Sequence, residues 1–168
     1  MRQLSIWAIV VIGLALLEAT WLPVISIQRV VPNLMLVLVV YFAITEGTER
    51  GMYTGLIGGI FQDVSSNTGI GHHVLCLVVV GFVVGRMARR LITDNPYVKT
   101  VTVFVASIAH GIFYLLIEYV QKVDAGAIYT MSFSVMPEAF YTAVVTPIIF
   151  YLIERIRPVS IYGQGYST

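Results

Sequence analysis

The sequence predicts an all-α, polytopic membrane protein, a transmembrane bundle of six helices in one integral membrane domain covering residues 1–168. Composition is the first indication, because 58% of the residues are apolar, 11% are charged and the mean hydropathy is +0.86, whereas a soluble domain has about 25% charged residues. The apolar segments are the second indication. When they are assigned to the membrane, no remaining stretch of the chain could bury a water-soluble core. The third is a glycine repeat from Gly51 to Gly59, which disfavours a helix in water but suits one in a bilayer, where unpaired backbone is forbidden.

The apolar segments of the sequence predict six helices. We expect helices at about residues 4–22, 32–46, 50–63, 74–92, 98–120 and 137–156. The first resembles a signal peptide, but Leu17 stands three residues back from the candidate cleavage site, where a small residue is required, so we expect a retained helix. Trp7 and Trp21 lie where interfacial aromatic residues would anchor its ends. Glu18 is either a carboxylate near the headgroups or a buried one that requires a partner.

Helix length and shape vary along the chain. Residues 33–45 rise about 20 Å, against a hydrocarbon core of about 30 Å, and the glycine-rich segment after them is similarly short. These two segments are either short crossing helices extended by their polar ends or a re-entrant pair shielded from lipid by neighbours. Pro137 suits the first turn of the sixth helix, and Pro147 should kink that helix by freeing the Ala143 carbonyl.

Glycines predict where helices approach one another closely. Gly51, Gly55 and Gly59 share one helical face at four-residue spacing, and Gly81 and Gly85 repeat the pattern in the fourth helix. A face without side chains lets a second helix approach to backbone distance. We therefore expect these glycines to form a packing surface, occupied either by another helix of the same chain or by the span of a partner.

An outer-face polar site is predicted at Asp63 and Arg29. Asp63 ends the third helix before a loop rich in Ser, Asn, Thr and Gly, and Arg29 lies in the first loop. The C-terminal end of a helix disfavours an anion, so Asp63 requires compensation. Either the backbone amides of Ser65 and Ser66 cap it, or it pairs with Arg29.

A polar stripe follows the fifth helix. Ser107, His110, Tyr114 and Glu118 recur at spacings of three and four residues and therefore share one face. With Glu138 of the sixth helix they are candidates for an intramembrane polar cluster. Such a cluster either joins helices by hydrogen bonds, the ordinary role, or lines a small-molecule site near the midplane.

Basic residues orient the bundle. With the N-terminus in the cytoplasm, eight Lys and Arg residues fall on the inner side and two on the outer side. The inner set is Arg2, Arg50, Arg86, Arg89, Arg90, Lys99, Arg155 and Arg157, and the outer set is Arg29 and Lys122. Because basic residues favour the cytoplasmic side, both termini should be cytoplasmic and Asp63 should face outward.

Residue patterns typical of enzymes do not occur in the sequence, which has no serine elbow, phosphate loop or paired metal carboxylates. His72 and His73 are adjacent, so they point in different directions, unlike a metal pair on one helical face. We expect these two histidines near the membrane interface, and we expect no catalysis, metal or cofactor. No basic run indicates nucleic acid, and Cys76, the single cysteine, excludes an intrachain disulfide.

Several motifs follow one another in a characteristic order. They are Pro32-Asn33-Leu34 opening a short helix that contains Tyr41, then Gly51, Gly55 and Gly59 before Phe61, Gln62 and Asp63, then Gly69 and Gly71, and finally Gly81 and Gly85 before an arginine cluster. In this order they resemble the family of the rod shape-determining protein MreD, over about residues 31–90 by motif and the whole chain by length and helix number. Asn33 departs from the pattern, because aspartate is expected there in much of the family, so a charge-dependent role is not carried over.

The resemblance implies a non-enzymatic inner-membrane scaffold of the bacterial cell-elongation machinery. Such proteins pair with the single-span protein MreC and connect with the MreB cytoskeleton, the RodA glycosyltransferase and a penicillin-binding transpeptidase. The scaffold thereby helps to maintain rod shape and to direct lateral peptidoglycan synthesis. The family's fold is similar to that of the substrate-binding subunits of energy-coupling-factor vitamin transporters. The alternative function is therefore a small-molecule-binding subunit of a vitamin-type transporter. Membrane lipids are expected partners, and self-association into a homo-oligomer stays open.

Overall fold

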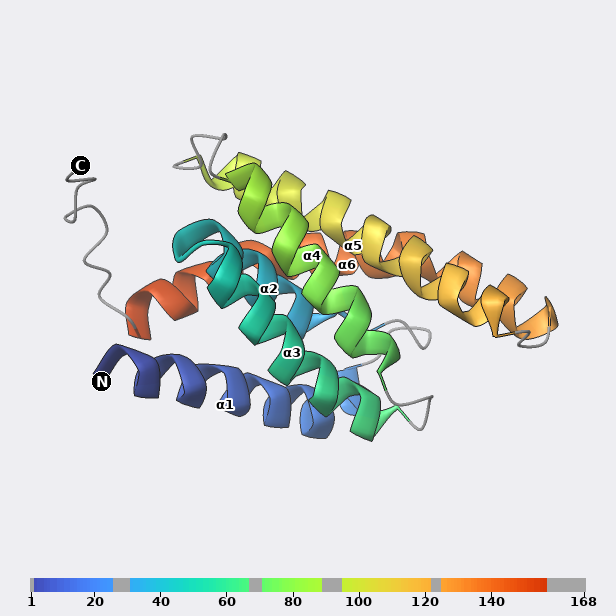
Figure 1. Cartoon of the computed structure of the whole chain (residues 1–168), viewed down its shortest axis with the longest axis horizontal. Helices are drawn as coiled ribbons and strands as arrows, with labels where there is room; N and C mark the ends of the chain where they lie inside the picture. Colours follow the sequence, from blue (N-terminus) through green and yellow to red (C-terminus); the bar gives the residue numbers. More distant parts are fainter. Residues whose placement is uncertain (1, 26–30, 67–70, 89–94, 122–124, 157–168) are drawn as a thin grey trace.

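Six α-helices make up the described part of the chain (Figure 1). The computed structural model describes residues 2–25, 31–66, 71–88, 95–121 and 125–156. The helices are α1 (Arg2–Ile25), α2 (Leu34–Thr45), α3 (Thr48–Ser65), α4 (His72–Ala88), α5 (Pro96–Val120) and α6 (Ala125–Ile156). No strand occurs within these ranges, so the predicted all-α fold with six helices is confirmed.

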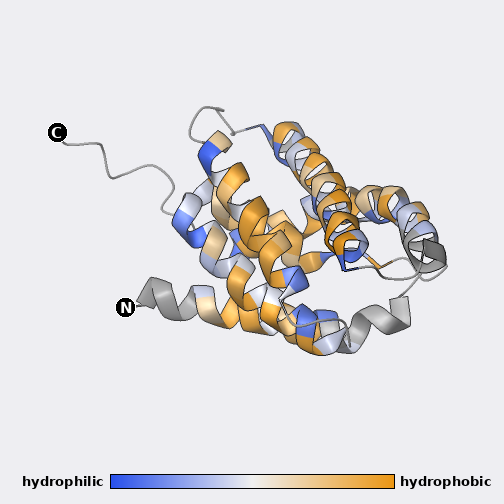
Figure 2. Ribbon diagram, turned by 45° about the vertical axis from the view of Figure 1, so that its right-hand side comes forward, coloured by the Kyte–Doolittle hydropathy of each residue, from blue (hydrophilic) through white to orange (hydrophobic). Residues whose placement is uncertain are grey.

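The surface of the bundle is that of a membrane protein. Two segments, Tyr97–Val120 in α5 and Ser132–Arg155 in α6, are long and apolar enough to cross a bilayer. Large apolar side chains such as Leu116 and Phe140 are exposed along them, an arrangement that lipid favours and water does not. Figure 2 shows hydrophobic residues along the bodies of the helices and hydrophilic residues mostly toward their ends.

Helix α2 is the centre of the fold. Its residues from Leu34 to Ala43 are buried, and it contacts each of the other five helices. Figure 1 shows it near the middle of the bundle, with α1 on one side and the α5–α6 pair on the other. A helix that is apolar on every side is stable when other helices surround it. This short helix therefore has the protein-lined surroundings that shield a segment too short to span the bilayer.

Helices α3 and α4 pack more extensively than any other described pair. A Cβ atom on Gly55 would lie 2.6 Å from the Leu77 carbonyl oxygen, and one on Gly81 would lie 2.7 Å from the Gly51 carbonyl oxygen. Real Cβ atoms do not approach so closely, and only glycine fits at these positions. The two helices therefore meet backbone to backbone, which maximises their dispersion contacts.

Trp7 is buried, whereas the sequence predicted an interfacial position. Its side chain is 8% exposed, and its Nε1 donates a hydrogen bond to Thr54 Oγ1 at 3.0 Å. The Arg50 guanidinium lies 5.3 Å from the centre of the same ring. Because α3 supplies both a hydroxyl and a cation, the indole joins α1 to α3. The side chain of Trp21 lies outside the described residues.

Helix α6 begins twelve residues earlier than predicted, at Ala125, so the prediction that Pro137 opens it was wrong. Both Pro137 and Pro147 lie inside the helix. Proline removes one backbone donor, whereas ending the helix within lipid would leave several backbone groups unpaired. At other ends the differences are small: α1 continues to Ile25, and residues 89–92 of the predicted fourth helix lie outside the described ranges.

Candidate functional site

A set of polar side chains joins four helices at the N-terminal end of α2. We call it the four-helix polar cluster, and its members are Glu18 of α1, Asn33 before α2, Gln62 of α3, and Glu138 and Thr142 of α6. The Glu18 carboxylate accepts hydrogen bonds from Met35 N at 2.9 Å and from Gln62 Nε2 at 2.6 Å. Of the two interpretations of Glu18, the structure supports a carboxylate with partners inside the protein.

Asn33 has the most connections in this cluster. Its Oδ1 accepts from Leu36 N, as the N-cap of α2, and from Gln62 Nε2, both at 2.9 Å. Its backbone N–H donates to Thr142 Oγ1 at 3.1 Å, and its side-chain amide hydrogen-bonds the Glu138 carboxylate. One asparagine therefore fixes α2 against both α3 and α6, a role that needs the amide's donor as well as its acceptor.

The four-helix polar cluster contains two carboxyl groups beside the N-terminus of α2. Glu18 and Glu138 are close enough for their charges to repel. The positive end of the α2 dipole offsets this repulsion, because Glu18 accepts a hydrogen bond from Met35 in the first turn of α2. Sequence reasoning missed Gln62 and Asn33 as members. A signal for Asn33 was available, since an asparagine directly before an apolar helical segment is a typical N-cap.

Asp63 caps α4 from the end of α3. Its carboxylate accepts from the backbone N–H groups of Gly71 at 2.8 Å, His73 at 2.9 Å and Val74 at 3.4 Å. We expected the amides of Ser65 and Ser66, but the Ser66 N–H donates to the Gln62 carbonyl instead. The N-terminus of α4 supplies the positive dipole that α3 denies to this carboxylate. Arg29, the other expected partner, lies outside the described residues.

The polar stripe of α5 faces the first turn of α4. Ser107, His110 and Glu118 are buried. The His73 ring lies 4.9 Å from that of Tyr114 and 6.0 Å from that of His110, in stacked orientations. These contacts bring the α5 stripe together with a histidine that we expected at the membrane interface.

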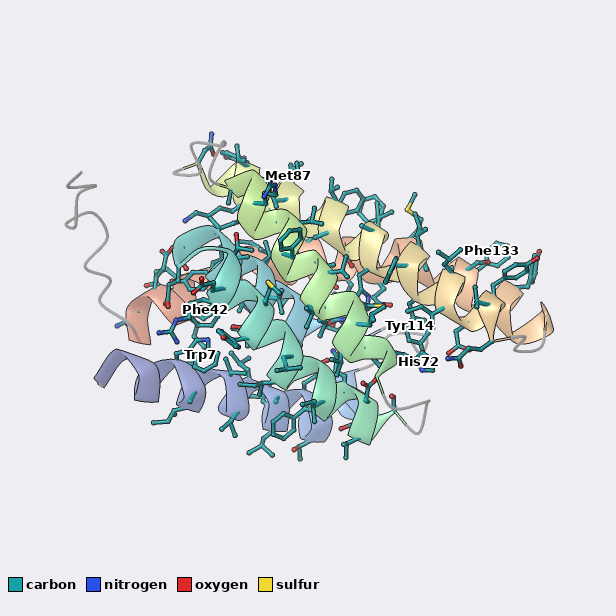
Figure 3. The ribbon with its side chains drawn as sticks, in the orientation of Figure 1. Trp7, Phe42, His72, Met87, Tyr114 and Phe133 are labelled. Carbon is teal, nitrogen blue, oxygen red and sulfur yellow. The ribbon has the colours of Figure 1, made fainter. Side chains whose placement is uncertain are left out.

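His72 adds an edge contact to this group. Its ring lies 6.2 Å from that of Tyr114 (Figure 3), and it is buried. Glu138 does not join these residues, because its partner is Asn33 in the four-helix polar cluster. Within the described ranges, no three His, Cys, Asp or Glu side chains are arranged to hold a metal ion.

The predicted packing glycines lie at the contact between α3 and α4. Gly51 and Gly81 face each other, Gly55 faces Leu77, Gly59 faces Val74, and Gly85 faces Thr48. The face that they share on α3 is therefore covered by α4 of the same chain. A partner that binds this protein in the membrane must use another surface.

A protein-family model matches the sequence. The family model described as rod shape-determining protein MreD matches residues 1–156, nearly the whole chain. Neither the search of curated proteins nor the search of solved structures found a match. The similarity to the fold of energy-coupling-factor subunits therefore stays a prediction.

Proposed function

Because the chain belongs to the family of the rod shape-determining protein MreD, we propose that it is a non-enzymatic scaffold of bacterial cell elongation that binds an MreC-like single-span protein. The family consists of membrane proteins of the MreB and MreC shape machinery, so a role in rod-shape determination follows from membership. The observation that carries the proposal is the extent of the match, over residues 1–156. Through its partner the scaffold would connect with RodA and a penicillin-binding transpeptidase and direct lateral peptidoglycan synthesis.

The internal contacts of the bundle support a scaffold. The α3–α4 contact leaves no room for side chains at its glycines, and the four-helix polar cluster links α1, α2, α3 and α6 by hydrogen bonds. A rigid body presents a constant surface, which lowers the entropic cost of binding a partner. The proposed location is the bacterial inner membrane, with both termini in the cytoplasm.

The proposed partner surface is the exposed side of α6. Tyr129, Phe133, Phe140 and Val144 are exposed there at helical spacings that give one continuous apolar face. Aromatic side chains supply large contact areas at low entropic cost. A single transmembrane helix has the shape to lie along this face.

A pull-down of the tagged full-length protein in mild detergent tests the proposal. A single-span membrane protein in stoichiometric amount is the expected result, and cells depleted of the protein should become round. Recovery of a nucleotide-binding coupling module in place of the single-span protein would overturn the scaffold.

The second candidate is the small-molecule-binding subunit of a vitamin-type transporter. Two buried ring nitrogens, His72 Nδ1 and His110 Nε2, have no hydrogen-bond partner among the described residues and favour it, because such groups normally bind something. A ligand that survives purification would support this candidate. At 100 times its dissociation constant it would add about 2.7 kcal/mol to stability, measurable as a higher melting temperature.

A further inference from the structure

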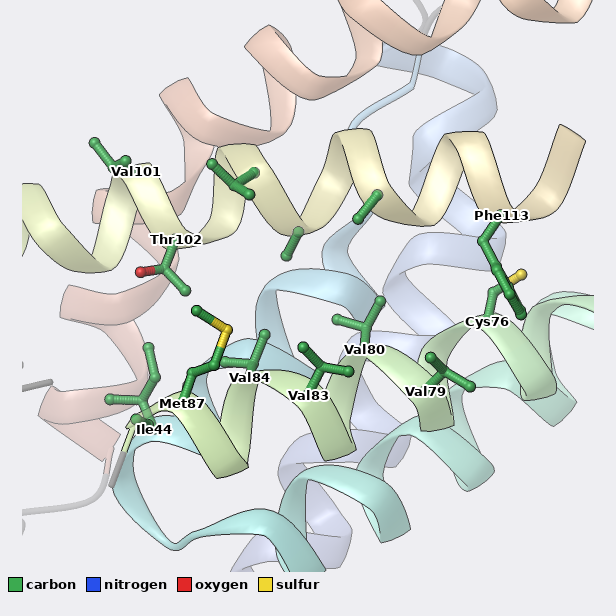
Figure 4. A pocket seen from close by; sticks show the side chains of 14 residues that line it. Ile44, Cys76, Val79, Val80, Val83, Val84, Met87, Val101, Thr102 and Phe113 are labelled. Atoms are coloured by element: carbon green, nitrogen blue, oxygen red, sulfur yellow. The ribbon is translucent and has the colours of Figure 1, made fainter. Parts of the chain in front are cut away.

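An apolar groove runs between α4 and α5, on the side of α4 away from its glycines. Figure 4 shows Val79, Val80, Val83 and Val84 of α4 along one wall, with side chains of α5 opposite them. The groove has a volume of about 320 Å³. Val79 and Val83 are also exposed, so the groove opens sideways toward the lipid.

The walls of this groove suit hydrocarbon and not a polar ligand. Almost all lining side chains are apolar. The one hydroxyl, of Thr102, donates within its own helix to the Val98 carbonyl at 2.7 Å. A polar ligand would lose hydrogen bonds to water without gaining any from these walls.

The width of the groove excludes a whole helix. Its wall on α4 extends from Cys76 to Ala88, a rise of about 18 Å at ~1.5 Å per residue. Helices α4 and α5 also contact each other directly, and packed helices lie about 8–10 Å apart, so no third helix fits between them. The groove therefore suits a long, narrow and flexible apolar group such as a hydrocarbon chain.

One end of the groove carries positive charge. Arg86 lies in the last turn of α4, beside the lining residue Met87, and Arg89 and Arg90 follow in the sequence. The ion pairs among the described residues are Glu46–Arg50 and Lys99–Glu154, so no carboxylate there neutralises Arg86. An uncompensated cation at the membrane surface attracts anionic headgroups.

From this shape and charge we infer that the groove binds one acyl chain of an anionic phospholipid, with its headgroup at Arg86. The chain fills the apolar groove between the facing sides of α4 and α5, and the headgroup lies near the C-terminal end of α4. The lipid thus completes the bundle on the side of α4 that α3 does not cover. This inference is independent of the proposed function.

Photolabelling of the full-length protein in lipid nanodiscs tests the inference. Phosphatidylglycerol with a diazirine in its acyl chain is irradiated, and labelled peptides are quantified by mass spectrometry. Residues of the groove should be labelled severalfold more than the exposed residues of α6, which report ordinary lipid contact. Unlabelled phosphatidylglycerol should compete better than phosphatidylcholine.

Variants separate the acyl-chain site from the headgroup site. Val83→Phe should reduce groove labelling to the level of α6, whereas Val64→Phe, at an exposed valine of α3, should leave it unchanged. Ala109→Phe fills the groove from α5 and replaces Val83→Phe if that variant does not fold. Arg86→Gln should remove the preference for phosphatidylglycerol over phosphatidylcholine.

Three results would overturn the inference. One is equal labelling of the groove and of α6. Another is groove labelling that persists in both groove-filling variants. The third is a photoreactive residue at position 83 that, in native membranes, cross-links to the span of another protein and not to lipid.

Discussion

Helix α4 contacts its two neighbours in opposite ways. Against α3, backbone meets backbone, and a Cβ on Gly55 would lie 2.6 Å from the Leu77 carbonyl oxygen. Against α5, valines facing small residues such as Ala106 and Ala109 leave a groove of about 320 Å³. Small side chains therefore have two outcomes. Glycines in matching positions on two helices bring the backbones together, whereas a small residue opposite a β-branched one leaves space that the branched side chain is too short to fill.

The largest effect is expected on the glycine side. Gly55→Leu should destabilise the protein by about 3 kcal/mol, the upper part of the usual overpacking cost, because the obstructing atoms are backbone. The measurement is thermal unfolding of the purified protein, together with its abundance in the membrane. Gly13→Leu is the matched control, since no atom of the described residues lies within 4 Å of a Cβ at Gly13. Equal stability of the two variants would contradict the close contact.

A smaller effect is expected where α3 holds the end of α4. Asp63→Ala removes the acceptor of three backbone N–H groups and should cost about 2 kcal/mol, as for loss of a strong helix cap. Asp63→Asn keeps an acceptor oxygen and should lose less, so the pair separates hydrogen bonding from charge. Denaturation in detergent measures both. Hydrogen exchange should also speed up selectively in the first turn of α4, and an unchanged exchange rate there would argue against the cap.

On the groove side, truncation should have little effect. Val83→Ala should change stability by no more than about 0.5 kcal/mol, because this side chain is exposed in the groove. Val39→Ala is the comparison, since Val39 is fully buried in α2 and its truncation should cost about 1 kcal/mol or more. Thermal unfolding in one lipid composition ranks the two. A larger loss for Val83→Ala would mean that the groove is closed by packing.

The smallest effect is expected from single cysteines at the ends of the bundle, which should not change stability. Labelling them shows which end of the groove faces the cytoplasm. In a Cys76→Ser background, single cysteines at positions 67 and 122 should react with an impermeant reagent from outside the cell, and those at positions 95 and 167 should not. That result would place the Arg86 end of the groove in the cytoplasmic leaflet. Outside labelling at position 95 would overturn the six-helix orientation.

Composition and periodicity determine the class of this protein because they are local properties. A chain with 58% apolar residues and apolar segments between polar turns must satisfy its backbone within helices, which predicts the all-α fold of six helices. Four-residue spacing shows that Gly51, Gly55 and Gly59 share a face. Helix ends were less predictable, as α6 shows, because lipid lets a helix continue through Pro137.

Only the tertiary structure decided which groups meet. Periodicity gives the face of a residue but not the helix opposite, so it did not show that Asp63 reaches the start of α4 or that Glu138 turns to Asn33 and away from the α5 stripe. These partners are set by how the helices are rotated about their axes and where they cross. That arrangement depends on the combined packing of all six helices around α2, and no single segment of sequence contains it.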